Sequence, residues 1–341
     1  MKTKYGKYIF SDLRDDMPLS FMDQPQAYFR GAWQVLGANI NMGWQVIKAP
    51  VYMERAPHTH DCDEYFVFMG TDLYDPFASF DAEIELRLGP EKEWHIINEP
   101  TFVYIPKGFP HTPMEFRIVN KPLIFQAIHL GPRFHKSQAG KEYWWEGPTR
   151  SPEGWMGHPD WSRPVNRKSK KDEAVDRQNS LYGKYLFSGL KENMSLDFIN
   201  DPSAYFRGAS QIPESSINMG WQLITKNVFL EKEPHTHNVP EYFAFLGGEL
   251  PDVFGSFDAE IELYLGPENE KHVITEPSFV YIPEGFSHCP LNFKNVNKPL
   301  MFQAIHLGPR FQKTIGGKEY WYDGPDCKNE GWEGHPGWNE G

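Results

Sequence analysis

The chain has 341 residues, more than one hydrophobic core usually serves, so the first expectation is two domains of about 150 residues each. It is 40% hydrophobic and 15% aromatic, a composition that excludes a disordered protein. With 34 Lys and Arg against 46 Asp and Glu, the formal net charge of −12 disfavours nucleic acid and anionic membrane surfaces as partners.

Three cysteines are too few for a disulfide framework, and residues 1–16 carry charges where a secretory signal needs an apolar stretch. No run of residues approaches the roughly 18 apolar residues that a spanning helix requires. The sequence therefore predicts a cytoplasmic protein that does not enter the membrane.

The apolar runs of the first half are short and are separated by Gly, Pro, Asn and Asp, as expected for strands. No long segment with a helical period competes with them. One run, AEIELRL, alternates apolar with charged residues and predicts an antiparallel strand with one face in solvent. A β-sandwich or small barrel is the simplest architecture for the predicted strands Ile40–Ile47, Glu64–Met69, Ala82–Leu88, Thr101–Ile105 and Leu123–Leu130.

The second half repeats the first at a constant offset of 177 residues. The sequence PHTH at Pro57–His60 recurs at Pro234–His237, and FQAIHLGPRF at Phe125–Phe134 recurs at Phe302–Phe311. No insertion or deletion separates the copies, so each copy should own a core. The prediction is a tandem duplication, with domains at 1–161 and 181–341 joined by a charged linker at 162–180.

Each copy carries His-x-His, then Glu after three residues, and later Pro-x-Gly-x-x-His. Alternate residues of a strand face the same side, so the paired histidines can aim at one point, to which turns can return the other two side chains. Three imidazoles and a carboxylate suit a divalent transition metal, with Fe(II) or Mn(II) favoured and Ni(II), Cu(II) or Zn(II) also suitable. The predicted ligands are His58, His60, Glu64 and His111, and His235, His237, Glu241 and His288.

A lone His-x-His is more often a hydrogen-bonded polar pair than a metal site. Here all four ligand types occur in the same order twice. The loop between the ligands has diverged from Asp61–Asp63 to Asn238–Pro240, whereas the ligands have not. The repeated set therefore favours metal binding over the simpler interpretation, and its open coordination positions allow chemistry.

These residues resemble the two motifs of the cupin superfamily, and the duplication resembles a bicupin. Pro106–His111 and Pro283–His288 match the second motif, while departures from the motifs lie at turn positions, where Tyr52 or Phe229 replaces the opening Gly of the first. The resemblance implies an all-β chain of two tandem antiparallel jelly-roll barrels, each holding a metal by three His and one Glu. It also implies that the protein can form a homo-oligomer.

Phenylalanines two and four residues after each Glu ligand predict a largely apolar cavity suited to a small organic substrate. Polar residues found in both copies could hold a substrate, although an ion pair or a core hydrogen bond is the simpler explanation for each of them. By resemblance, Arg55 matches the substrate-binding Arg of bicupin oxalate decarboxylases, where the second copy has Lys232. The candidate substrate residues are Arg30, Gln45, Arg55, Phe66, Phe68, Gln126, Arg207, Gln222, Phe243, Phe245 and Gln303, with His129, His306, Arg133 and Arg310 as further polar candidates.

Cupins include dioxygenases, decarboxylases, isomerases, lyases and binding proteins, so the fold alone does not decide the reaction. The leading hypothesis is a metal-dependent oxidoreductase, a dioxygenase of a small carboxylate, carbonyl or phenolic substrate. The second is a lyase or decarboxylase, which needs a proton donor that only Glu115 suggests, and Asn292 replaces it in the second copy. The third, a protein that binds metal or a small molecule without turnover, is disfavoured because both copies keep all ligands.

Overall fold

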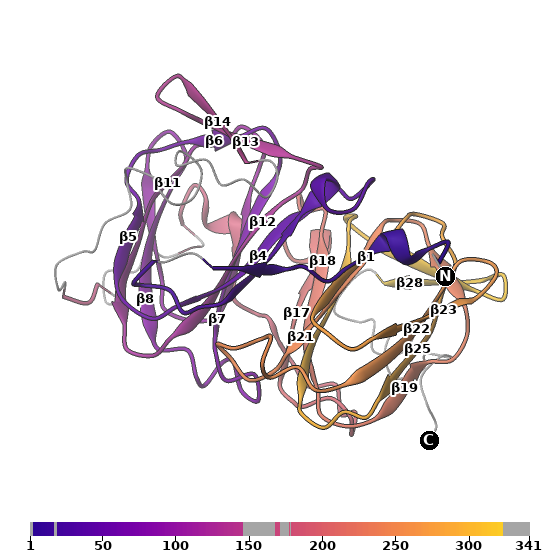
Figure 1. Ribbon diagram of the computed structural model, residues 1–341. Helices are drawn as coiled ribbons and strands as arrows, with labels where there is room; N and C mark the ends of the chain where they lie inside the picture. The colour runs from indigo at the N-terminus through magenta and orange to yellow at the C-terminus, as the bar shows by residue number, and fades with distance from the viewer. Residues whose placement is uncertain (1–2, 17–18, 146–167, 171–176, 178, 323–341) are drawn as a thin grey trace. The chain divides into compact units, whose positions relative to one another are not determined.

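The computed structural model describes residues 3–16, 19–145, 168–170, 177 and 179–322. In these ranges every strand pair is antiparallel, and the helices are single 3-10 turns of three residues. No helix in the described ranges is both long enough and apolar enough to cross a membrane. The predicted all-β class is confirmed, and the strands form two jelly-roll barrels (Figure 1).

The first barrel lies within residues 14–190. Its elements are β2 (Arg14–Asp15), β3 (Gln26–Arg30), η2 (Gly31–Trp33), β4 (Asn41–Ile47), β5 (Val51–Glu54), β6 (Thr59–His60), β7 (Glu64–Gly70), β8 (Ala82–Leu88), β9 (Glu93–Ile97), β10 (Thr101–Ile105), β11 (His111–Val119), β12 (Leu123–His129), β13 (Phe134–Gln138), β14 (Lys141–Trp145), η5 (Gly183–Tyr185) and β15 (Leu186–Phe187). The five predicted strands correspond to β4, β7, β8, β10 and β12, with ends that agree to within one residue.

Three sheets make up this barrel, in the orders β15-β10-β7-β12-β4-β3-β2, β5-β11-β8-β9 and β14-β13-β6. Phe68 of β7 packs against Phe116 of β11 with 6.0 Å between ring centroids, so the first two sheets enclose the core. Both side chains are fully buried. Because alternate residues of a strand face the same side, Glu64 and Phe66 of β7 point into the same interior as Phe68.

The second barrel comprises the described residues up to Leu13 and from Lys191 onward. Its elements are η1 (Gly6–Tyr8), β1 (Ile9–Phe10), β16 (Lys191–Glu192), β17 (Ser203–Arg207), η6 (Gly208–Ser210), β18 (Asn218–Ile224), β19 (Val228–Glu231), β20 (His235–His237), β21 (Glu241–Gly247), β22 (Glu260–Leu265), β23 (Glu270–Ile274), β24 (Ser278–Ile282), β25 (His288–Lys294), β26 (Leu300–His306), β27 (Phe311–Ile315) and β28 (Lys318–Tyr322). They form the sheets β1-β24-β21-β26-β18-β17-β16 and β23-β22-β25-β20-β27-β28, with β19 paired to β25.

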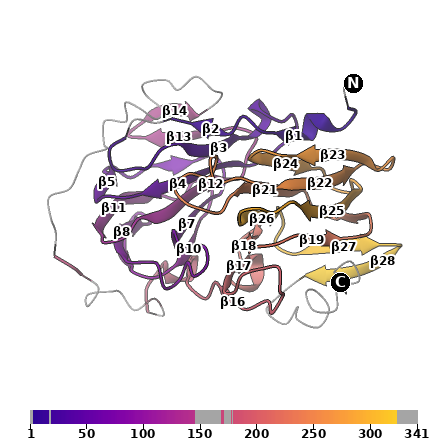
Figure 2. The same ribbon diagram turned by 60° about the horizontal axis from the view of Figure 1, so that its bottom comes forward.

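The first short strand of each copy of the repeat belongs to the barrel formed mainly by the other copy. Strand β1 pairs with β24, as Figure 2 shows, and β15 pairs with β10. Tyr5 precedes β1, and its ring lies edge-on to Phe286 at 5.1 Å. A Cβ on Gly266, whose φ is +76°, would come within 2.1 Å of that ring, so glycine is needed there. The compact units thus differ from the predicted 1–161 and 181–341, which describe the sequence repeat.

The predicted solvent-exposed face of β8 is covered in the structure, which corrects that expectation. Glu83 and Glu85 are only 3% and 9% exposed. Arg117 of β11 donates to both carboxylates, at 3.1 Å and 2.9 Å, and Lys170 lies 3.5 Å from Glu85. Ion pairing allows these charges to be buried, which an alternating pattern alone does not reveal. Glu115 lies in the same cluster, 3.7 Å from Arg117, rather than among the metal-ligand candidates.

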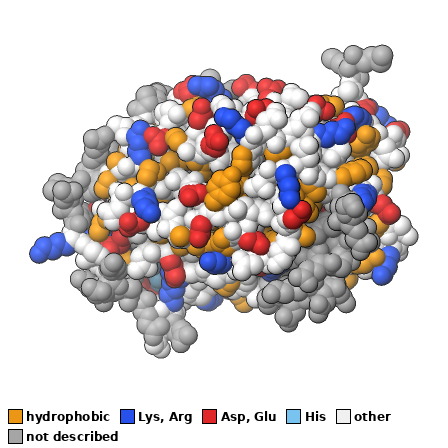
Figure 3. All heavy atoms as spheres, turned by 90° about the horizontal axis from the view of Figure 1, so that it is seen from below, with side chains coloured by type: hydrophobic (Ala, Val, Ile, Leu, Met, Phe, Trp, Pro, Cys, Tyr) orange, Lys and Arg blue, Asp and Glu red, His pale blue; other side chains and the backbone are white. Residues whose placement is uncertain are grey.

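The outer surface carries charges of both signs. On the face seen in Figure 3, acidic and basic side chains are interspersed with hydrophobic ones. This mixture agrees with the formal net charge of −12, in which 34 basic residues accompany 46 acidic ones. A continuous basic surface of the kind that binds a polyanion is not seen among the described residues of that face.

Candidate metal centres

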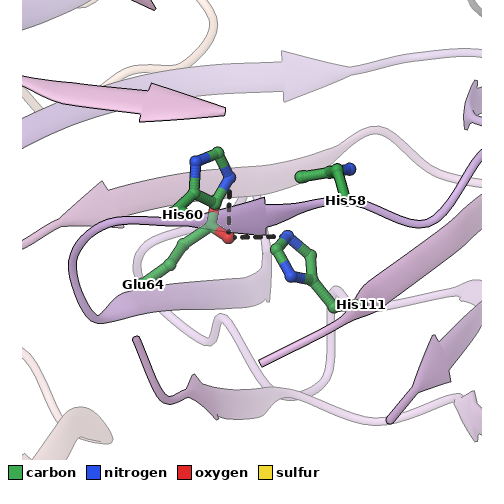
Figure 4. A group of neighbouring side chains, drawn as sticks. All are labelled: His58, His60, Glu64 and His111. Carbon is green, nitrogen blue, oxygen red and sulfur yellow. Dashed lines mark ion pairs between the residues drawn. The ribbon is translucent and has the colours of Figure 1, made fainter. Parts of the chain in front are cut away.

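The first barrel brings its four predicted ligands together in the interior (Figure 4). His58 and His60 come from the segment ending in β6, while Glu64 and His111 are the first residues of β7 and β11. All four are buried, and their ligand atoms lie within 4.8 Å of one another. Glu64 Oε2 is 3.4 Å from His60 Nε2 and 2.9 Å from His111 Nε2.

The second barrel repeats this arrangement with His235, His237, Glu241 and His288. Glu241 Oε2 is 3.4 Å from His237 Nε2 and 2.8 Å from His288 Nε2. These ligand atoms also lie within 4.8 Å of one another. The strand alternation and the two turns that the sequence indicated therefore bring the four residues together in both copies.

Contacts at Nδ1 orient the imidazoles of the first barrel. His60 Nδ1 lies 3.0 Å from the carbonyl oxygen of His135, and His111 Nδ1 lies 3.1 Å from that of Phe109. A carbonyl can only accept, so Nδ1 donates and Nε2 keeps a free lone pair. His237 and His288 make the same contacts with Gln312 and Phe286, at 3.0 Å each. These outer contacts fix the tautomer that a metal ligand needs.

The electrostatics favour neutral imidazoles beside an ionised carboxylate. Burial lowers the pKa of His58 and His60 well below the usual 6.5, and it does the same to His235 and His237. Burial alone would raise the pKa of Glu64, but the surrounding histidines, His129 first among them, hold it well below 4.5. The resulting donor set is the one that a divalent metal requires near neutral pH.

Unpaired polar atoms at the centre of each group provide a test of whether a cation fits. Glu64 Oε2 and His111 Nε2 are buried and close together, yet neither makes a hydrogen bond with acceptable geometry. Glu241 Oε2 and His288 Nε2 are in the same state. Buried polar atoms nearly always have a partner, so the two unpaired atoms in each barrel require one, and a single cation between them would serve both. The two sites fit a divalent transition metal, as the sequence predicted.

A further histidine contacts the second oxygen of each carboxylate. His129 Nε2 lies 2.9 Å from Glu64 Oε1, and His306 Nε2 lies 3.0 Å from Glu241 Oε1. Each imidazole stacks on a phenylalanine, Phe134 or Phe311, with ring centroids 3.7 Å apart. His129 and His306 thus contact the oxygen other than the one beside the ligand histidines, and they restrain the orientation of the carboxylate.

In the second barrel the ligands His235, His237 and Glu241 line a small cavity of about 70 Å³. Its wall is mostly apolar, which agrees with the prediction made from the phenylalanines that follow the Glu ligand. Besides the ligands, the cavity is lined by Gln222, Leu230, Glu231, Phe243, Cys289, Leu291, Phe302, Ala304, His306, Phe311 and Lys313.

Sequence reasoning missed the buried ion pair in this wall. Lys313 Nζ lies 2.7 Å and 2.8 Å from the two carboxylate oxygens of Glu231, and the lysine side chain is 4% exposed. The first copy has Lys136, which is 1% exposed. A usable signal was present, since Lys136 and Lys313 occupy equivalent positions and lie two residues after Phe134 and Phe311, on the buried face of strands β13 and β27.

Several predicted substrate residues lie elsewhere, which corrects the candidate set. Arg30 pairs with Asp15, and Arg207 pairs with Glu192. Arg55 is exposed and lies over the Tyr52 ring, with its guanidinium carbon 5.5 Å from the ring centroid. Arginine finds carboxylate or aromatic partners at the barrel ends, as the simpler interpretation of these residues held. Arg133 and Arg310 likewise lie over Trp144 and Trp321.

Strand parity removes two more candidates. Phe125 and His129 of β12 face the interior, so Gln126, which is displaced by an odd number of residues, points to the other face of the sheet. Gln303 of β26 occupies the equivalent position and is also fully buried. Gln303 is not among the residues that line the cavity of the second barrel.

The remaining candidates divide between the site and the core. Gln45 donates to the hydroxyl of Tyr28, and Gln222, which lines the cavity, donates to that of Tyr205. Phe66 and Phe243 lie beside the ligands, since their ring centroids are 6.0 Å and 6.1 Å from those of His111 and His288. Phe68 and Phe245 stack on Phe125 and Phe302 at 5.3 Å and belong to the core.

Comparison with protein-family models and with curated proteins gives no match. Among solved structures, oxalate decarboxylase from Bacillus subtilis at pH 4.6 aligns with a TM-score of 0.60 and 13% identity over 93% of this chain and 80% of that chain. A structure of the same enzyme, from a study of its Mn(II) centres, aligns with a TM-score of 0.60 and 12% identity over 93% and 81% of the two chains. At this identity the likeness shows the fold alone, two jelly-roll barrels in one chain, and each barrel here holds one group of four candidate ligands.

Proposed function

We propose that this bicupin is a metal-dependent enzyme that acts on a small carboxylate, with decarboxylation or a related lyase reaction as its chemistry. The observation that carries the proposal is a buried ligand group that opens on a small cavity walled by apolar side chains and one Lys–Glu pair. The structural likeness to oxalate decarboxylase, an enzyme with Mn(II) centres, gives the lyase hypothesis more weight than the sequence did. By the same likeness we propose Mn(II) as the metal.

A divalent metal held by the three histidines and the glutamate would supply Lewis-acid stabilisation to negative charge on the substrate. The apolar wall, including Phe243 and Phe302, excludes water from the reacting group. In a decarboxylation the bond between the carboxylate carbon and its neighbour breaks, carbon dioxide leaves, and the electron pair stays on the neighbouring carbon. That carbon then takes a proton, which the Glu231–Lys313 pair holds in the cavity wall.

A dioxygenase is the second candidate, and one observation favours it. Four protein ligands leave two positions on an octahedral ion, enough for a substrate and dioxygen side by side. Fe(II) would be the fitting metal for that reaction, and the substrate could then bear a carbonyl or phenol. The apolar wall is compatible with both candidates, because each needs a dry site.

The metal and the gas that is formed or consumed separate these reactions. Purified protein would be analysed for metal, loaded with Mn(II) or Fe(II), and offered small carboxylates, diketones and phenols while carbon dioxide and dissolved oxygen are measured. The proposal expects carbon dioxide release without stoichiometric oxygen uptake. Oxygen consumed one to one with substrate would favour the dioxygenase, and metal binding without turnover would contradict both enzymatic hypotheses. His60→Ala and His237→Ala each disable one barrel and show which one works.

The proposal keeps a small molecule as the partner and excludes nucleic acid, which the net charge of −12 supports. A homo-oligomer and a cytoplasmic location stay predictions. Light scattering of the purified protein tests the first, and fractionation of cells that express the protein tests the second.

A further inference from the structure

The buried lysine of the second barrel has no role in holding the metal ligands. Lys313 lies on β27 directly opposite His237 of β20, so both side chains face the barrel interior. Phe311 and Ile315 on the same strand are also buried, whereas Gln312 and Thr314 between them are partly exposed. The strand alternation therefore places the ammonium group of Lys313 in the cavity wall.

Lys313 keeps donor capacity beyond its partner. Its two hydrogen bonds, of 2.7 Å and 2.8 Å, both go to the carboxylate of Glu231. An ammonium group has three hydrogens, so one hydrogen is available to an acceptor in the cavity. Removing a lysine from water costs free energy that its attraction to one carboxylate rarely offsets. An apolar side chain would fill the same place in the wall without this desolvation penalty.

Charge counting in the cavity indicates what that acceptor would be. A divalent cation, Lys313, Glu231 and Glu241 together carry one net positive charge in a wall made largely of leucine and phenylalanine. An uncompensated charge in such surroundings is costly, and one singly charged anion cancels it. A carboxylate accepts a charge-assisted hydrogen bond from an ammonium group, whereas a neutral ligand leaves the excess charge in place.

The first copy supports a role that the repeat preserves. Lys136 is 1% exposed and lies opposite His60, as Lys313 lies opposite His237. At the position equivalent to Glu231 the sequence also has a glutamate, residue 54. Of the 14 residues that line the second cavity, three differ from their first-copy equivalents, and the lysine is not one of them.

We infer that Lys313 is an anion-binding residue that holds the carboxylate of a singly charged substrate in the second cavity, and that Lys136 does so in the first barrel. This inference rests on the proposed function for its substrate class, but it makes a claim about binding alone. Glu231 orients the ammonium group and sets the net charge that the substrate must cancel.

The test measures binding of acetate and formate by calorimetry, with acetamide as the neutral probe. The protein carries His60→Ala, which leaves the second barrel as the metal site, and is loaded with Mn(II). We expect acetate and formate to bind, acetamide to bind at least tenfold more weakly, and Lys313→Met to weaken acetate at least tenfold while the metal content stays the same. Lys318→Met, an exposed lysine on the adjoining β28, is the matched control and should leave affinity unchanged.

A second variant covers the case in which the buried Glu231 left by Lys313→Met unfolds the barrel. Glu231→Gln with Lys313→Met removes both charges, and it must also lose acetate affinity, whereas Glu231→Gln alone must keep or increase it. Unchanged acetate affinity in a folded, metal-loaded Lys313 variant overturns the inference, and so does equal binding of acetamide. Anion binding without any turnover would contradict the proposed function and leave the inference standing, so the two failures are distinguishable.

Discussion

Protonation of the metal-free sites should destabilise the protein just below neutral pH. In the unfolded chain a histidine titrates near pH 6.5, whereas burial lowers the pKa of His58, His60, His235 and His237 in the folded chain. As the pH falls through 6.5, these histidines bind protons in the unfolded state but not in the folded state. The stability from these groups is therefore fully present above the unfolded pKa and is lost as the pH falls below it.

The size of the effect follows from the number of such groups. Each histidine lowers the free energy of unfolding by up to about 1.4 kcal/mol per pH unit between its unfolded and folded pKa values. Two ligands in each barrel give up to about 3 kcal/mol per pH unit. His95 and His272, whose pKa values burial also lowers, act in the same direction. Glu64 and Glu241 add no slope in this interval, because their folded pKa lies below the unfolded value of 4.5 and the stability they contribute is lost only as the pH falls below that value.

Urea unfolding of chelator-treated protein between about pH 7.5 and 5.5 measures this slope. Replacement of His58 and His60 together by glutamine should flatten the pH dependence of the first barrel and leave that of the second unchanged. A free energy of unfolding that is constant across this interval would refute the reasoning. So would a wild-type slope in the doubly substituted barrel, because the buried ligands would then not be the source of the linkage.

Three other predictions concern the same elements. His60→Ala and His237→Ala should each remove about one metal per chain, measured by elemental analysis against the wild type, and a wild type that holds one metal would leave one barrel without a site. His129→Gln or His306→Gln should weaken metal binding about 10- to 100-fold in its own barrel, measured by competition with a chelator, because each imidazole restrains the ligand carboxylate; equal affinity would contradict a positioning role. Phe245→Ala should cost about 3–5 kcal/mol of stability in a urea titration, because its ring is fully buried against Phe302, without changing the metal content.

The fold and the ligand group were accessible from the sequence because both depend on local periodicity. The His-x-His spacing places two imidazoles on one side of a strand wherever that strand lies, and the 177-residue offset gives the number of barrels. The exchanged strands β1 and β15 were not accessible. Their pairing with β24 and β10 is a contact between distant segments, and two-residue strands carry no period of their own.

Substrate residues were harder to predict, because the occurrence of a residue in both copies does not reveal which way its side chain points. Arg30 and Gln126 recur in the second copy as faithfully as Lys136 does, yet Arg30 serves an ion pair and Gln126 faces away from the cavity. Counting whether a residue lies an even or an odd number of positions from an inward-facing residue of the same strand would have distinguished Gln126 from Lys136. Counted along β12 from His129, Gln126 is on the wrong face, whereas Lys136 lies opposite His60.

Comparison of the two copies also distinguishes the cavity residues that are the same in both barrels from those that differ. The residues that differ around the second cavity are Leu230, Leu291 and Cys289, which replace Met53, Met114 and Thr112. The third exchange alters a contact of a ligand. His58 and His235 both contact an equivalent backbone carbonyl, that of Ala56 or Glu233, and Thr112 Oγ1 lies 3.1 Å from His58 Nδ1 as well. Thr112 gives His58 a hydroxyl contact that Cys289 cannot supply to His235, so the same four donors lie in two different settings. The two barrels should therefore take the same metal and hold it with different affinities.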